Sequence, residues 1–217
     1  MPSFHPEPPF THGQADRTAV LLCNLGTPDE PTAPAVRRYL AQFLGDHRVV
    51  EIPKLLWMPI LHGIILRTRP AKSAAKYASI WTPEGSPLAH WTAKQATLLR
   101  GWLGEAGHAV LVRHAMRYGN PSIASQLDAL KAEGATRILI LPLYPQYSAT
   151  TTASVFDAVY TWAAATRNVP ELRFVNHYHD APGYIDALAR TIETHWKHHG
   201  QPCLLYTSDA ADDSLRV

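Results

Sequence analysis

The sequence predicts an α/β fold in which a parallel β-sheet is flanked by helices. Short apolar segments recur along the 217 residues, and a longer amphipathic stretch follows each of them. Segments that are apolar almost throughout are typical of parallel strands covered on both faces. Alternation of such strands with helices is typical of βαβ units.

Four segments have the composition of buried strands. Most are rich in leucine and β-branched residues, and turn residues or amphipathic stretches separate them. The predicted strands are 18–24 (TAVLLCN), 108–114 (HAVLVRH), 137–142 (RILILP) and 173–178 (RFVNHY).

The remaining segments have helical periodicity, with apolar residues at intervals of three and four. In the second of them the apolar stripe includes Trp91, Leu98 and Trp102, and we expect it to pack inward. In the third, Ser122 is the expected N-cap and Gly134 ends the helix. The predicted helices are 35–44, 87–105, 122–134, 155–166 and 184–199.

Composition argues against several classes of protein. Hydrophobic residues at 46% argue against a disordered chain, and a net charge of +2 gives no reason to expect a nucleic-acid partner. Cys23 and Cys203 form no C-x-x-C pair, which argues against a disulfide scaffold or a zinc ribbon. No secretory signal is visible in residues 1–17, which we expect to form a flexible arm. These features favour a cytoplasmic protein.

Residues 53–69 contain an apolar stretch, 55–66, with basic residues on its border. The stretch is interrupted by Pro59 and Gly63 and is too short to span a bilayer. Two interpretations are open. The stretch forms an exposed lip that covers an apolar ligand or rests on a membrane surface, or its side chains pack into the core.

Polar and aromatic side chains follow each predicted strand, where parallel sheets bind ligands. They suit a broad aromatic molecule that carries anionic groups. The segments are 24–28 (NLGTP), 116–121 (MRYGNP), 143–154 (LYPQYSATTTAS) and 177–184 (HYHDAPGY).

Several of these features have a simpler interpretation than ligand binding. Gly26 permits a tight turn, which is favoured because no phosphate-binding glycine motif is present. One of the threonines 150–152 caps a helix rather than cradling a phosphate. His177 and His179 are surface residues rather than a metal pair. The same interpretation holds for the histidines at a predicted helix end, His195, His198 and His199.

Four motifs resemble, in their order and spacing, ferrochelatase, the family that inserts ferrous iron into a porphyrin in the last step of haem synthesis. They are NLGTPD at 24–29, KSAAKYASIW and GSPL between 72 and 88, MRYGNPSI at 116–123 and LPLYPQYSATTTAS at 141–154. The resemblance implies one chelatase-like half of Rossmann or flavodoxin type over residues 18–202, including the lip at 53–69. A second half would complete the porphyrin cleft.

The resemblance also implies the residues that line the porphyrin pocket. Arg69 resembles an arginine that meets a propionate at the pocket mouth, and Leu25 resembles the residue over the porphyrin face. Leucine at position 25 resembles the protoporphyrin-using branch. No matched residue is catalytic or binds a metal. The implied substrate-binding residues are Leu25, Arg69, Tyr77, Ser86, Arg117, Tyr118, Tyr144, Ser148, Ala149 and Thr150.

The implied substrates are protoporphyrin IX and ferrous iron, with no bound cofactor, and the product is protohaem. The stretch 55–66 resembles the family's membrane-facing lip, which implies peripheral contact with the inner membrane. The missing C-terminal half of the enzyme is a further implied partner.

The sequence departs from the family where the chemistry is carried. The family's catalytic histidine in an S-x-H-G-x-P motif and a glutamate of the second half are not found, and residues 203–217 (CLLYTSDAADDSLRV) resemble neither. We expect a non-native tail and a chain that is inactive alone. The alternative is a flavodoxin-like module that holds a flavin or phosphate at SATTTAS. A third interpretation is a catalytically silent interaction domain.

Overall fold

The computed structural model describes residues 4–9 and 12–200, and the chain divides into two compact units, Met1–His177 and Tyr178–Val217. The predicted tail 203–217 lies outside the described residues. In the first unit the strands are β1 (Arg17–Gly26), β2 (Leu111–Tyr118), β3 (Ala135–Pro142) and β4 (Glu171–Phe174). Its α-helices are α1 (Ala33–Gly45), α2 (Lys54–Ile60), α3 (Leu66–Ile80), α4 (Pro87–Glu105), α5 (Ile123–Ala132) and α6 (Ser154–Ala164). Two π-helical segments, Leu61–Ile65 and Ala149–Ala153, precede α3 and α6.

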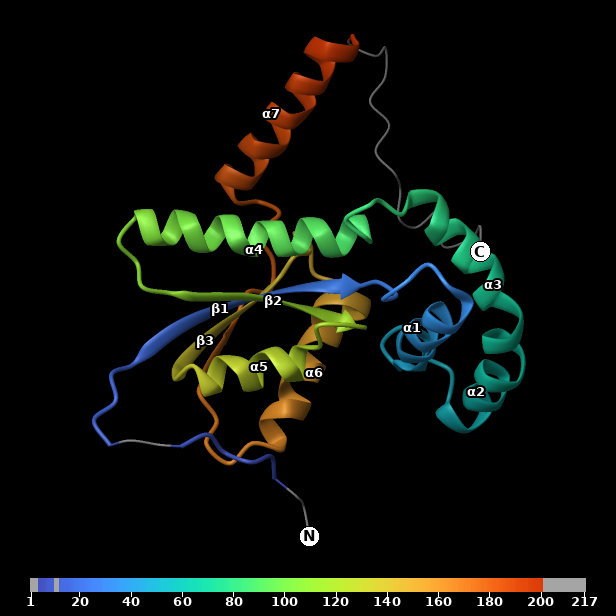
Figure 1. Cartoon of the computed structure of the whole chain (residues 1–217), viewed down its shortest axis with the longest axis horizontal. Helices are drawn as coiled ribbons and strands as arrows, with labels where there is room; N and C mark the ends of the chain where they lie inside the picture. The colour runs from blue at the N-terminus through green and yellow to red at the C-terminus, as the bar shows by residue number, and fades with distance from the viewer. Residues whose placement is uncertain (1–3, 10–11, 201–217) are drawn as a thin grey trace. The chain divides into compact units, whose positions relative to one another are not determined.

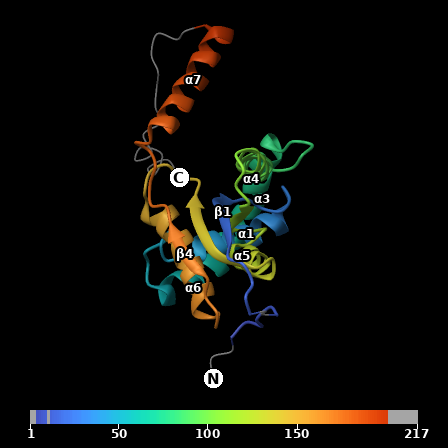
Figure 2. The same ribbon diagram turned by 90° about the vertical axis from the view of Figure 1, so that its left-hand side faces the viewer.

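The four strands form one parallel sheet in the order β2-β1-β3-β4. Leu22 of the central strand β1 is paired with His114 of β2 and Leu141 of β3. Helix α4 covers one face of the sheet, and α5 and α6 cover the other (Figure 1 and Figure 2). This arrangement confirms the predicted α/β fold.

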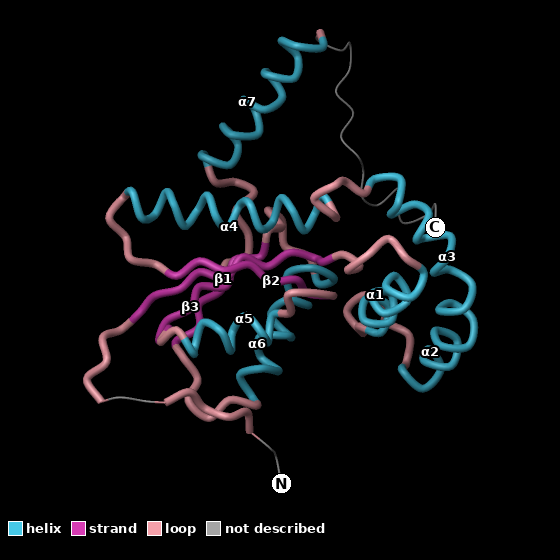
Figure 3. The backbone as a smooth tube through the Cα atoms, in the orientation of Figure 1, coloured by secondary structure: helices cyan, strands magenta, loops and turns pink. Residues whose placement is uncertain are grey.

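The hydrophobic core lies on both faces of the sheet, because successive side chains of a strand point to opposite sides. Leu21 packs with Leu127 of α5 and Val159 of α6. Leu22, the next residue, packs with Ala96 of α4 on the other face. Helices α1, α2 and α3 gather beyond the carboxyl ends of β1 and β2 (Figure 3), where they can border a ligand.

The predicted N-terminal arm contacts the domain through Glu7. Its carboxylate pairs with Lys131 of α5 and accepts hydrogen bonds from the backbone N–H groups of Arg167 (2.9 Å) and Asn168 (3.1 Å). These contacts hold the pKa of Glu7 below its usual range.

The fourth strand is shorter than the predicted 173–178. The last ladder bond runs from the Val175 N–H to the Ile140 carbonyl, at 3.0 Å. The next bond would need an N–H at position 142, where proline has none. Strand β4 therefore ends at Phe174, and His177 and His179 do not lie on a strand.

The helices within 54–80 were not predicted. Pro59 and Pro70 argue against a continuous helix, because each removes a backbone donor. The chain nevertheless forms α2 and α3, with the π-helical segment Leu61–Ile65 between the two prolines. The irregular turn keeps the helical direction where the ordinary bonding pattern is interrupted.

Helix α4 has the predicted bounds but buries a different stripe. Thr92 and Ala96 are its buried residues. Trp91, Leu98 and Trp102, which were expected to pack inward, are exposed. Leu99 and Leu103 of the predicted stripe do pack, partly buried, against the core cluster of Leu22, Ala96 and Val112. The side of α4 that faces the sheet is therefore turned away from Trp91, Leu98 and Trp102.

The second unit contains the described helix α7 (Pro182–His199). Lys197, His198 and His199 occupy its last turn, where positive charge is favoured by the helix dipole. The rings of His195 and His199 stack at 4.2 Å. The histidines thus lie at a helix end, as the sequence indicated. No helix among residues 4–9 and 12–200 is long and apolar enough to cross a membrane.

Candidate functional site

A cavity of about 500 Å³ opens at the carboxyl end of β1, the edge where parallel sheets bind ligands. The end of β1, the middle of α1, the second half of α3 and the start of α4 each contribute to its wall. The lining residues are Leu25, Gly26, Thr27, Tyr39, Tyr77, Ile80, Ser86, Pro87, Leu88 and Trp91.

The turn after β1 is held close to the turn after β2 by two glycines. Gly26 has a φ of 106°, and a Cβ atom built there would lie 1.8 Å from the Tyr118 carbonyl oxygen. A Cβ at Gly119 would lie 2.7 Å from the Thr27 carbonyl oxygen. The favoured interpretation of Gly26 as a turn residue agrees with this geometry, and the close approach explains why only glycine fits.

Asn24 fixes the cavity floor to α4. Its Nδ2 donates to the Thr92 Oγ1 at 2.9 Å, and its Oδ1 accepts from the Leu25 N–H at 2.8 Å. Thr92 is buried. These hydrogen bonds link the end of β1 to the second turn of α4 and fix the backbone at Leu25, which preorganises this part of the wall.

Tyrosines form the aromatic side of the cavity. The rings of Tyr39 and Tyr77 meet edge to face at 6.3 Å, and Tyr39 stacks on Phe43 at 6.1 Å. Burial raises the pKa of Tyr39 and of Tyr77. Both phenols are therefore neutral at physiological pH, and the wall presents rings rather than charge.

Two hydroxyl groups add polarity to this mostly apolar lining. Ser86 is buried at the N-cap position of α4, and its side chain makes no capping hydrogen bond. The buried Thr27 Oγ1 has no hydrogen-bond partner among the described residues.

Beside the cavity, the Asp46 carboxylate organises a buried polar cluster. One oxygen, Oδ2, accepts hydrogen bonds from Arg117 Nη2 (2.6 Å), the Tyr118 hydroxyl (2.8 Å) and Ser154 Oγ (2.6 Å). The other, Oδ1, accepts from the Arg48 N–H at 2.8 Å. The carboxylate joins the end of α1 to β2 and to the start of α6.

The Asp46 cluster shifts the pKa values of its members. Burial acts to raise the pKa of Asp46, but the hydrogen bonds and the Arg117 charge outweigh it and lower that pKa overall. Burial raises the pKa of Tyr118 to about 12. The carboxylate is thus ionised and the phenol neutral, which fits a structural clamp.

The structure brings three of the ten residues implied by the resemblance into the cavity wall: Leu25, Tyr77 and Ser86. Arg117 and Tyr118 lie instead in the Asp46 cluster, where Arg117 Nε also donates to Ser154 Oγ at 2.7 Å. Arg69 is exposed on α3, about two turns before Tyr77. Its guanidinium is available to a ligand.

The other four implied residues follow β3. Tyr144 packs against the main core, and its buried hydroxyl has no partner within the described part of the chain. Ser148 is the N-cap, because its Oγ accepts from the Thr150 N–H at 3.3 Å. The cap expected from threonines 150–152 is thus supplied by Ser148, while Ala149 and Thr150 are exposed.

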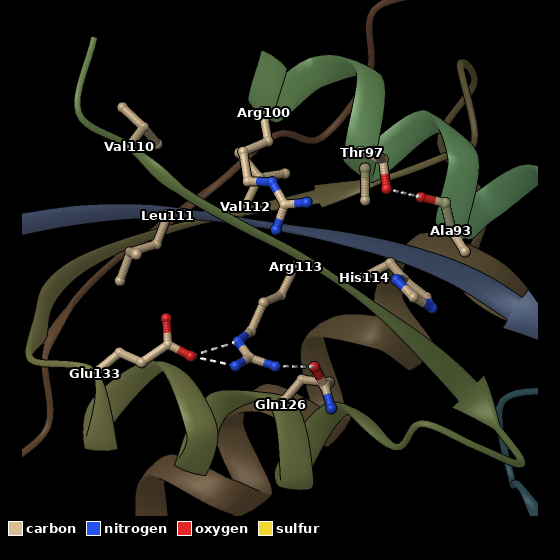
Figure 4. Close-up of a pocket in the computed structure, with 11 residues that line it drawn as sticks. Ala93, Thr97, Arg100, Val110, Leu111, Val112, Arg113, His114, Gln126 and Glu133 are labelled. Carbon is tan, nitrogen blue, oxygen red and sulfur yellow. Dashed lines mark hydrogen bonds and ion pairs between the residues drawn. The ribbon is translucent and has the colours of Figure 1, made fainter. Parts of the chain in front are cut away.

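A second hollow, of about 330 Å³, lies along the outer edge of β2 between α4 and α5 (Figure 4). Arg113 spans it, donating from Nε to Glu133 at 3.0 Å and from Nη1 to Gln126 at 3.2 Å. Burial, together with the Arg113 charge, lowers the pKa of His114. None of the implied substrate residues lines this hollow. Its charged side chains lie along β2, an edge strand, where charge discourages pairing with a strand of another chain.

Sequence reasoning missed Asp46, Tyr39 and Trp91 as parts of the site. Asp46 follows a predicted helix beside His47 and Arg48, which gives the pattern of an exposed turn. The side chains that donate to it, those of Arg117, Tyr118 and Ser154, are 71 or more residues away along the chain. For Trp91 the sequence did contain a signal, the apolar periodicity of α4, but we interpreted it as evidence that Trp91 packs into the core.

Comparison with known proteins finds the ferrochelatase family, whose model matches residues 17–208. Ferrochelatase of Methylibium petroleiphilum is 75% identical over 196 residues, which are 90% of this chain and 54% of the relative. Ferrochelatase of Polaromonas sp. is 72% identical over 203 residues, 92% of this chain and 55% of the relative. The chain spans about half the length of the curated relatives it matches.

Proposed function

This chain belongs to the ferrochelatase family, and we propose that it supplies the porphyrin-binding wall of an enzyme that inserts ferrous iron into protoporphyrin IX to form protohaem. The observation that carries the proposal is the apolar, tyrosine-lined cavity at the carboxyl end of β1. Leu25, Tyr77 and Ser86, which match family motifs, meet in its wall although they come from three different elements.

The chemistry of the wall suits one face of a porphyrin. Neutral phenol rings and aliphatic side chains contact a flat apolar macrocycle without desolvating a charge. The exposed guanidinium of Arg69 lies on the helix that carries Tyr77, so it can meet a propionate at the mouth. Thr27 and Ser86 offer hydroxyls to polar edges of the ligand.

Metal insertion needs a base that removes pyrrole protons, and such a base works best with a pKa near the operating pH. The cavity wall has no histidine or carboxylate among its lining residues. We therefore assign binding to this chain and proton removal to the second half of the enzyme. Ferrous iron is the second substrate.

A titration of the chain with protoporphyrin IX, followed by porphyrin absorption and fluorescence, tests the binding role. Leu25→Asp places a charge in the cavity wall and is expected to weaken binding at least about tenfold, because the charge loses water without gaining a partner. Leu98→Asp, on the exposed side of α4, is the matched control and leaves the affinity unchanged. Equal affinities of the two variants would remove the cavity from the proposal. Binding of riboflavin phosphate in place of porphyrin would favour a flavodoxin-like module.

We also propose that the protein is cytoplasmic and touches the membrane surface through its lip, 53–69. Leu55 and Leu56 are exposed at 88% and 63%. Leu61 and Leu66 of the same stretch are buried and anchor it. This exposure supports the lip interpretation over packing of the whole stretch into the core.

A further inference from the structure

The outer face of α4 carries a seam that is apolar except for Gln95, and which we define as Leu88, Trp91, Gln95, Leu98 and Trp102. The intervals along the seam are three, four, three and four, the spacing by which one helix packs against another. Trp91, Leu98 and Trp102 are 56%, 62% and 66% exposed. Tryptophan at the centre of a patch is typical of protein–protein contact residues.

The seam is continuous with the candidate porphyrin cavity. Leu88 and Trp91 belong to the seam and also line the cavity. A third hollow, lined by Leu98 and Trp102 among others, lies farther along the same helix. An element that covers the seam would therefore also close the open side of the cavity near Trp91.

We propose that the seam is the docking surface for an apolar helix of the enzyme's second half. The relatives are almost twice as long as the segment they share with this chain, since the matched part is 54% and 55% of two of them. A flat macrocycle bound by one wall needs a second wall to exclude water. Lys94 places its Nζ 4.6 Å from the centre of the Trp91 ring, at the seam's border. The docking helix is thus expected to carry an acidic side chain there.

This inference rests on the proposed function for the identity of the partner, but its test uses no porphyrin. Trp102→Cys is introduced into this chain and at the aligned position of the full-length Methylibium petroleiphilum relative. Maleimide labelling of that thiol is followed by peptide mass spectrometry. We expect labelling at least tenfold slower in the full-length relative than in this chain. Arg100→Cys, an exposed position of the same helix that lies outside the seam and outside the hollow lined by Leu98 and Trp102, is the matched control and labels equally in both.

Three results would overturn the proposal. Equal labelling of Trp102→Cys in both proteins would show that the second half leaves the seam open. If Trp102→Cys already labels slowly in this chain, without a second half, then another part of the same chain covers the seam. A dimer of this chain in light scattering that Trp102→Ser dissociates would make a second copy the occupant. A failed porphyrin titration would leave the labelling ratio intact, so the two proposals fail separately.

Discussion

At the scale of single residues, Asp46 is the charged group whose loss should matter most for stability. Asp46→Asn leaves Arg117 beside a neutral amide, and we expect a loss of about 2 to 3 kcal/mol at pH 7. Urea unfolding measures it. Asp157→Asn removes the partner of the part-exposed Arg48 and should cost about 1 kcal/mol or less.

The same variant has a defined pH dependence. Because the pKa of Asp46 is lower in the folded protein than in the unfolded chain, its contribution is complete above the unfolded pKa of about 4 and is lost as the pH falls through the folded value. The difference in unfolding free energy between wild type and Asp46→Asn should therefore be constant near pH 6 and should become smaller as the pH falls below about 4. A gap that stays constant would mean that the carboxylate charge is not what stabilises the cluster.

A comparison of Gly26 with Gly107 distinguishes the cost of a steric contact from the cost of backbone strain. Both have positive φ, 106° and 80°, but a Cβ meets the Tyr118 carbonyl only at Gly26 and has nothing within 4 Å at Gly107. Gly107→Ala should destabilise by about 1 kcal/mol, and Gly26→Ala by about 3 kcal/mol or more, since it also separates β1 from β2. Thermal unfolding compares them, and equal losses would contradict the contact argument.

At the scale of elements, the lip should determine membrane contact. Leu55→Ser with Leu56→Ser removes exposed apolar surface, so binding to phosphatidylglycerol vesicles should fall about tenfold while unfolding is unchanged. Trp57 Nε1, which donates to the Leu44 carbonyl at 2.7 Å, keeps α2 in place. Leu98→Ser is the control for an exposed leucine elsewhere. Vesicle sedimentation that is the same for all three proteins would exclude the lip as the contact.

The elements also show how far sequence patterns reach. Continuous apolar runs located β1, β3 and the first half of β2, because strands that are buried on both faces are apolar almost throughout. Strand β2 begins three residues later than the predicted 108–114 and extends to Tyr118. The end of β4 depends on Pro142 of its neighbour, which no local pattern reveals. Likewise, α4 has two apolar stripes, and periodicity cannot tell which one meets the sheet. The motif residues Leu25, Tyr77 and Ser86 were found through the resemblance. The ion pair between Arg117 and Asp46 could not be found in this way, because it joins residues that are close only in the folded chain.

At the scale of the whole molecule, the chain should bind porphyrin without metallating it. Tyr39 and Tyr77, the titratable groups of the cavity wall, have raised pKa values, and neither can act as a base at neutral pH. Anaerobic mixing with protoporphyrin IX and ferrous iron should therefore form haem at the protein-free rate, measured by its absorption. The full-length Methylibium petroleiphilum relative serves as the positive control. Repeated turnover by this chain would place a functional base within its own 217 residues, and the division of labour between binding wall and second half would have to be abandoned.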